Sequence, residues 1–114
     1  MAAILQAGRG RLAVGWYHVV DERWQATGKS EVLDVNILAR RIQQPTLVCG
    51  ELTEDERQIL KRKHKNVVMA SPAQSLRRPS YLAELAWQRW EAGQVDDPAT
   101  LAPIYLHIGD PIPG

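Results

Sequence analysis

The first twenty residues, MAAILQAGRGRLAVGWYHVV (Met1–Val20), decide the fold class of this chain. A short apolar run, Ala2 to Gln6, and a longer run rich in Val and aromatic residues, Arg11 to Val20, flank a turn with Gly8 and Gly10. Two apolar segments separated by a glycine-containing turn are typical of a β-hairpin. The sequence therefore predicts that the domain opens with two antiparallel strands.

The next segment predicts a third strand and then a helix. A turn at Asp21-Glu22-Arg23 leads into Trp24 to Leu33, where the residues alternate loosely as in a half-exposed strand. Asp34 can cap a helix that runs to about Gln43, with Pro45 just beyond it. The predicted inner stripe of this helix consists of Ile37, Leu38, Arg41 and Ile42.

Strands and helices are expected to alternate in the middle of the chain. Thr46 to Cys49 predicts a buried strand, and Asn66 to Met69 predicts another before a loop from Ala70 to Arg78. Between the two strands, Thr53-Glu54-Asp55-Glu56 is a capping box that starts a helix. The acids of its first turn and the bases of its last turn complement the helix dipole.

The last third reads PSYLAELAWQRWEAGQVDDPATLAPIYL (Pro79–Leu106). Ser80 can cap an amphipathic helix that Gly93 stops, and a polar break from Gln94 to Thr100 leads into the apolar tail Leu101 to Leu106. Pro103 favours an extended edge course for this tail. The helix carries an apolar stripe that consists of Leu82, Leu85, Ala86 and Arg89/Trp90. We expect the apolar tail that follows it to dock on another surface.

The predicted order is βββαβαβα, which indicates an α/β fold with a mixed five-stranded sheet covered by helices. With 114 residues, 45% of them hydrophobic, residues 1–114 suit a single domain with a modest core. The 14 Lys and Arg and 13 Asp and Glu give a net charge of +1, which makes no global case for nucleic-acid or membrane binding. Any such contact must be local.

The single cysteine, Cys49, allows no intrachain disulfide and no cysteine-based zinc cage, and it is expected to be a buried strand residue rather than a reactive thiol. Neither a signal peptide nor a membrane-length apolar run is visible. We therefore expect a soluble, cytoplasmic chain.

Both ends of the chain resemble one family. The helix ending in Ala-Gly, the acidic linker and A-P-I-Y-L resemble the C-terminus of TsaB (YeaZ) proteins, the non-catalytic partners in bacterial tRNA threonylcarbamoyladenosine synthesis. Met1 to Tyr17 is similar to the opening of that family's second domain, a strand that runs into D-A-R-x-G-E-V-Y. From Leu47 to Gln74 the similarity is one of pattern only.

The resemblance implies the second half of a tandem ribonuclease-H-like fold, as in the actin-like ATPase superfamily and the family labelled glycoprotease or peptidase M22. The first half-domain is absent, so we expect a truncated or separately cloned piece. The implied partners are a TsaD-like subunit, which is ATP- and metal-dependent, and a TsaE-like ATPase, bound mainly through the absent half. Contact with tRNA would be indirect, no membrane or cofactor is implied, and homodimer formation stays open.

The loop Gly8-Arg9-Gly10-Arg11 is one candidate site. In actin-like ATPases the equivalent hairpin wraps a nucleotide phosphate, and the alternative is a tight turn in which the glycines take positive φ. Gln6 stands where catalytic relatives place a metal-organising Asp, and a neutral amide is a poor Mg²⁺ ligand. Arg9 matches the basic residue of the family pattern and could make an ion pair or an anion contact, whereas Arg11 replaces an acidic residue.

No catalytic constellation is visible. His18, His64 and His107 lack metal-ligand spacing, and the chain has no G-x-S-x-G elbow, Walker motif or paired carboxylates in an apolar setting. The sequence therefore predicts no metal site and no enzyme activity.

A basic cluster and three aromatic residues are candidate contacts. Lys61, Arg62, Lys63 and Lys65, with Arg77-Arg78, form either a solvated helix end or a contact to the tRNA backbone. Trp87, Trp90 and Tyr105 pack in the core or tail, or contact the missing half-domain or a partner. Tyr105 and Ile104 match the family's tail motif, which we expect to pin the C-terminus onto the sheet.

We therefore expect a non-catalytic partner or scaffold domain. The first alternative is a degenerate actin-like ATPase or M22 peptidase-like half-domain, which nucleotide would stabilise against heat. The second alternative is a small tRNA-binding module that uses the basic cluster.

Overall fold

In the computed structural model, which describes residues 1–63, 65–103 and 106, a mixed open sheet of six strands combines with three α-helices. The strands are β1 (Ala2–Gly8), β2 (Arg11–Val20), β3 (Arg23–Ala26), β4 (Glu31–Leu33), β5 (Thr46–Gly50) and β6 (Val67–Met69). The helices are α1 (Val35–Arg41), α2 (Glu54–Lys63) and α3 (Pro79–Glu91), and Ala73–Ser75 form a short 3₁₀ turn. The prediction of an α/β fold with a mixed sheet is confirmed.

The strand order is β3-β2-β1-β5-β6, with β4 also paired to β2. Antiparallel pairs join β1 to β2 and β2 to both β3 and β4, whereas β5 runs parallel to β1 and β6 parallel to β5. The hairpin predicted from Met1–Val20 is therefore confirmed, with Ile4 opposite Val14. The first two turns use positive φ at Gly8, Arg9 and Gly10 and at Asp21 and Glu22.

The prediction of one third strand from Trp24 to Leu33 is wrong. That segment forms two short strands, β3 and β4, which pair with successive parts of the long strand β2. Between them, the backbone N–H and the hydroxyl of Thr27 both bond to the Trp16 carbonyl oxygen, and the chain then leaves the sheet through Gly28. The sheet accordingly has six strands instead of five.

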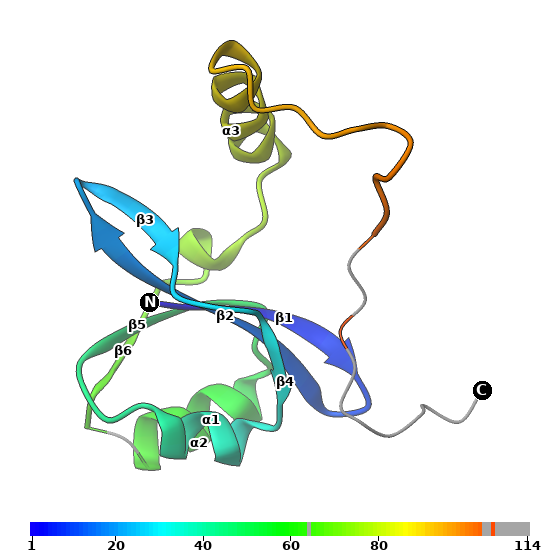
Figure 1. Cartoon of the computed structure of the whole chain (residues 1–114). Coiled ribbons are helices and arrows are strands. Elements are labelled where there is room, and N and C mark those ends of the chain that lie inside the picture. The colour runs from blue at the N-terminus through cyan, green and yellow to red at the C-terminus, as the bar shows by residue number, and fades with distance from the viewer. Residues whose placement is uncertain (64, 104–105, 107–114) are drawn as a thin grey trace.

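The core lies between one face of the sheet and helices α1 and α2, which lie below it in Figure 1. Alternate residues of β1 and β2 point to this face, as strand geometry requires. The core is built from Ala2, Ile4, Leu12, Val14, Leu33, Val35, Leu38, Ala39, Ile42, Val48 and Leu60. The predicted inner stripe of α1 holds for Leu38 and Ile42, but Arg41 is exposed and bonds to Glu31.

The capping box of α2 is confirmed. The Glu56 backbone N–H donates to the Thr53 hydroxyl over 3.2 Å, and the Thr53 N–H donates to Glu56 Oε1 over 2.9 Å. Glu56 is buried, and it also accepts a hydrogen bond from the Gln6 amide on β1. The cap therefore attaches the start of α2 to the sheet.

Helix α3 stands apart from the sheet (Figure 1), and none of its residues is buried. The radius of gyration, 15.7 Å, accordingly exceeds the roughly 13 Å of a compact domain of this length. The prediction that the helices cover the sheet is therefore wrong for α3. The second sheet face, with Ala3, Leu5, Ala13 and Cys49, is left without a covering helix in the part of the chain that is described.

The boundaries of α3 also differ from expectation. The helix begins at Pro79 with Arg78 at the N-cap, so the prediction that Ser80 caps it is wrong. Proline at the first helical position has its φ preset and lacks an N–H that would need a partner. Gly93, with a φ of 76°, follows the C-cap as predicted.

Candidate interaction surface

The largest exposed apolar feature in the described part of the chain is α3. Leu82 is 71% exposed, Leu85 58%, Trp87 55% and Trp90 61%. At 100° per residue, apolar side chains occupy most of the circumference of this helix. Ser80, Glu84, Gln88 and Glu91 form a polar side, and Arg89 lies within the apolar part, between Leu82 and Leu85. Helices that are apolar on most sides are normally buried.

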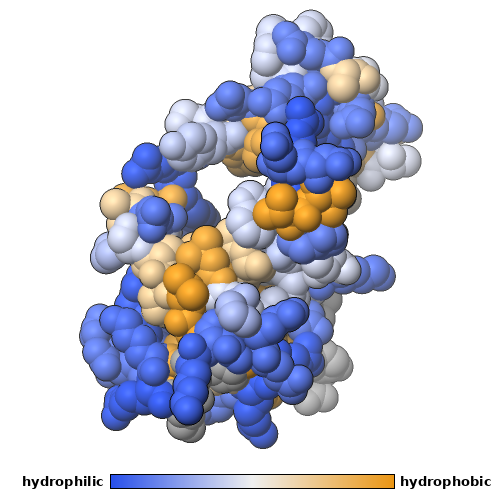
Figure 2. Space-filling view, turned by 90° about the vertical axis from the view of Figure 1, so that its left-hand side faces the viewer, coloured by the Kyte–Doolittle hydropathy of each residue, from blue (hydrophilic) through white to orange (hydrophobic). Residues whose placement is uncertain are grey.

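Trp87 and Trp90 lie against each other, with ring centroids 5.1 Å apart and planes tilted by 30°. The expectation that they pack in the core is wrong, because both indoles are more than half exposed. Together with Val95 and Leu101 they line a shallow groove of about 700 Å³. Figure 2 shows hydrophobic surface on the upper part of the molecule as well as at the level of the sheet.

The uncovered face of the sheet is the second apolar surface. Ala3, Ala13 and Cys49 line a depression of about 360 Å³ there, and Leu106 from the tail lies in the same wall. Cys49 lies on a strand, as predicted, but it is only partly buried because no helix covers this face. That burial still raises the pKa of its thiol, an effect the positive N-terminus partly opposes.

Tyr105 and Ile104, which we expect to pin the tail onto the sheet, lie outside the described residues. Their neighbour Leu106 lines the depression on the uncovered sheet face. The position of Leu106 places the end of the described chain next to that face.

The hairpin loop Gly8-Arg9-Gly10 is exposed at the far end of β1. Gln6 lies on β1, two residues before Gly8. Its side-chain amide donates to Glu56 Oε1 over 2.8 Å and to the Glu51 carbonyl over 3.0 Å. Glu51 in turn pairs with Arg77 over 2.7 Å. Gln6 is thus engaged in a network that holds β1, the end of β5 and the start of α2 together.

The basic residues divide between two places. Lys61 and Arg62 lie exposed in the last turn of α2, and Lys65 follows the helix. Arg77 instead forms an ion pair with Glu51, the residue just after β5. The side chain of Lys63 lies outside what the structure describes. Arg77 therefore does not join the cluster at the end of α2.

Only one of the three histidines lies in the part of the chain that the structure describes. His18 lies exposed on β2, while His64 and His107 lie outside the described residues. Within residues 1–63, 65–103 and 106, no group of three or more His, Cys, Asp or Glu side chains could hold a metal ion. None of the helices in the same part of the chain has the length and apolarity needed to cross a bilayer.

No model of a known protein family matches this chain, and no curated protein matches it either. The resemblance to TsaB therefore rests on the residues quoted above.

Proposed function

We propose that the chain is the second half-domain of a TsaB-like protein, and that it takes part in forming threonylcarbamoyladenosine in tRNA by binding other proteins rather than by catalysis. The observation that carries this proposal is the exposed apolar surface of α3. Contiguous apolar surface of this kind marks interaction sites in soluble proteins.

Two further features support the assignment. A ribonuclease-H-like half implies three antiparallel strands followed by two parallel strands, each entered through a helix. The observed sheet supports this order if β3 and β4 together take the place of the third strand. The A-P-I-Y-L tail follows the helix and the acidic linker in the family's order.

In this proposal α3 and the uncovered sheet face contact the first half-domain, and the assembled protein binds a TsaD-like subunit with a TsaE-like ATPase as a further partner. Burial of Leu82, Leu85 and Trp90 would supply the stabilisation, at roughly 1.5 to 3 kcal/mol for each fully buried large apolar side chain.

Tagging the protein at its chromosomal locus tests the proposal. The purified protein is expected to have about twice the mass of the 114-residue chain and to bring down a TsaD-like subunit. A protein of the chain's own mass, or one that purifies without that subunit at low salt, would contradict the assignment.

The association should also depend on α3. Leu82→Asp with Leu85→Asp introduces charge into the apolar face and is expected to lower recovery of the assembled protein. Gln88→Asp is the control, because it places a carboxylate on the polar side of the same helix.

A further inference from the structure

The end of the molecule at which the parallel strands begin carries a concentration of positive charge. Because β1, β5 and β6 are parallel, they all start at this end, which lies on the left in Figure 1. Helices α1 and α2 run back across the sheet and end here too, and Thr46 N–H bonds to the Asn66 carbonyl over 2.8 Å. Exposed bases in or just after the last turns of these two helices are Arg40, Arg41, Lys61, Arg62 and Lys65.

The positive charge of these bases exceeds the negative charge that lies close to them. Each helix C-terminus carries about half a negative charge. The nearest acidic partner shown is Glu31, which accepts two hydrogen bonds from Arg41 at 2.6 and 2.8 Å. Figure 2, which faces this end, shows hydrophilic residues crowding the lower part of the molecule, at the level of α1 and α2. This end is therefore locally basic in a chain whose net charge is only +1.

An aromatic groove of about 990 Å³ opens at the same end of the molecule. It lies between the β2–β3 hairpin and the loop that joins α1 to β5, and Arg41 forms part of its wall. Its rings come from Trp16, Tyr17, His18 and Trp24. Trp24 is 51% exposed, so a ligand in the groove can reach its indole.

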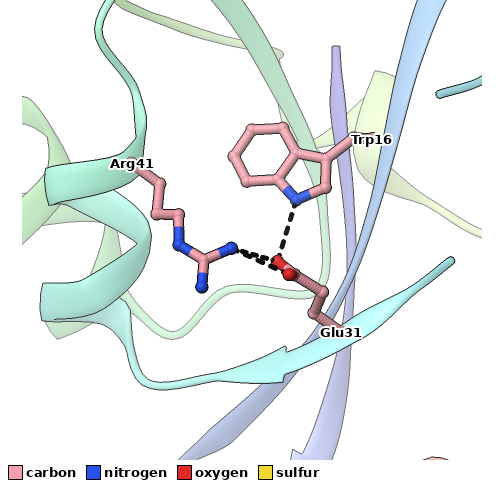
Figure 3. Close-up of polar contacts among 3 residues, drawn as sticks. All are labelled: Trp16, Glu31 and Arg41. Atoms are coloured by element: carbon pink, nitrogen blue, oxygen red, sulfur yellow. Dashed lines mark hydrogen bonds and ion pairs between the residues drawn. The ribbon is translucent and has the colours of Figure 1, made fainter. Parts of the chain in front are cut away.

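The wall of the groove is held by a polar contact between three elements (Figure 3). The Trp16 indole N–H donates to Glu31 on β4 over 3.3 Å, and Arg41 from the end of α1 bonds to the same carboxylate. The hydrogen bond from Arg41 stabilises the ionised carboxylate and lowers the pKa of Glu31. The indole and the guanidinium are therefore fixed before any ligand arrives.

We infer that this end of the domain binds single-stranded RNA, with an unpaired base stacked on Trp24 in the groove and phosphates bound by the bases at the ends of α1 and α2. Aromatic rings beside a row of cations are the combination that single strands require, because each nucleotide presents a flat base and a charged phosphate. An acidic peptide would use the cations and leave the rings unused. The inference stands on the geometry of this end and does not require the proposed TsaB-like function.

Fluorescence anisotropy with a labelled, unstructured ten-nucleotide RNA and the 114-residue chain tests the inference. Binding is expected to weaken with salt, at a log–log slope of about −0.7 for each phosphate contacted. Replacing Lys61 and Arg62 by Gln together should flatten that slope by about 1.4. Arg11→Gln, at the opposite end of β2, is the control that removes a positive charge away from this end, and it should leave the slope unchanged.

Trp24→Ala should weaken RNA binding about 5- to 150-fold, the range found when a base-stacking ring is removed. Trp24→Phe keeps a ring and should retain most of the affinity. Trp87→Ala removes an equally exposed indole from α3 and should have no effect. Circular dichroism of each variant separates loss of binding from loss of folding.

Three results would overturn the inference: no RNA binding at 50 mM salt, equal affinity for duplex RNA, or an affinity that Trp24→Ala leaves unchanged. The last result, together with equal binding of polyglutamate, would mean that the basic end attracts any polyanion. These outcomes are separate from those of the proposed function, which is tested through the TsaD-like subunit.

Discussion

Gly50 closes β5 at a position where only glycine fits. Its φ is 122°, and a Cβ atom there would lie 2.0 Å from the Ile4 carbonyl oxygen of the neighbouring strand. We expect Gly50→Ala to lower the free energy of unfolding by more than about 2 kcal/mol, because both the backbone conformation and the clash oppose it. Urea denaturation followed by circular dichroism measures the change.

Gly28→Ala is the control for that substitution. Gly28 has open space around the position of a Cβ atom, so its replacement should change stability by less than about 0.5 kcal/mol. Equal effects of the two substitutions would show that β5 and β1 do not approach as closely as described.

The Glu31–Arg41 pair predicts a pH dependence. The pKa of Glu31 is lowered in the folded state, chiefly by the hydrogen bond from Arg41, so the unfolded state binds more protons in acid. The stabilisation is complete above the unfolded pKa of about 4.3 and is lost as the pH falls through the lower folded pKa. Thermal melts from pH 7 to pH 3 should therefore show wild type and Glu31→Gln converging in acid.

Glu84→Gln is the control, because it removes a carboxylate from α3, where no bonding partner is described. The difference in melting temperature between wild type and this variant should not follow the pH dependence expected for Glu31→Gln. A constant gap between wild type and Glu31→Gln over this range would contradict a stabilising role for the pair.

Residue patterns differed in how well they predicted local structure. The Thr53–Glu56 capping box and Gly93 were correctly interpreted because their bonds and dihedrals are local to the motif. The need for glycine at Gly50 had no local signal, because it arises from Ile4, which lies on another strand. The Trp16–Glu31–Arg41 contact was missed for the same reason.

Among the elements, α3 is expected to be the least protected. It has 13 residues, none of them buried, and an isolated helix of that length is marginal in water. Hydrogen exchange should show α3 amides opening with a free energy below about 1 kcal/mol, while β1 and α1 approach the global stability. Addition of a binding partner should raise protection in α3 specifically.

Protection of α3 equal to that of α1 in the chain alone would contradict this description. Substitutions provide a second measurement. Trp90→Ala should leave the unfolding free energy within about 0.5 kcal/mol, whereas Leu60→Ala in the buried core should cost about 2 to 5 kcal/mol.

The helix and strand patterns were informative to different extents. The apolar periodicity of α3 predicted a helix correctly, but it could not show whether the apolar face meets this chain or another surface. The segment Trp24–Leu33 has strand-forming residues near its two ends, but Thr27 to Ser30 divide it into β3 and β4, which pair with successive parts of β2.

At the scale of the whole molecule, the order of elements was sufficient to predict an α/β fold with a mixed sheet, since hairpins and helical crossovers fix which pairs are antiparallel or parallel. The basic cluster at the end of α2 was recognised from the sequence, but the groove that joins Arg41 to Trp24 was not, because these two residues are distant in sequence. The proposed TsaB-like role accounts for the two surfaces left without cover.

The most direct test of that role is the threonylcarbamoyladenosine content of tRNA, measured by mass spectrometry of digested nucleosides in cells depleted of this protein. The content should fall on depletion and return with the wild-type gene or with Gln88→Asp, but not with Leu82→Asp and Leu85→Asp together. Unchanged modification after depletion would contradict the account.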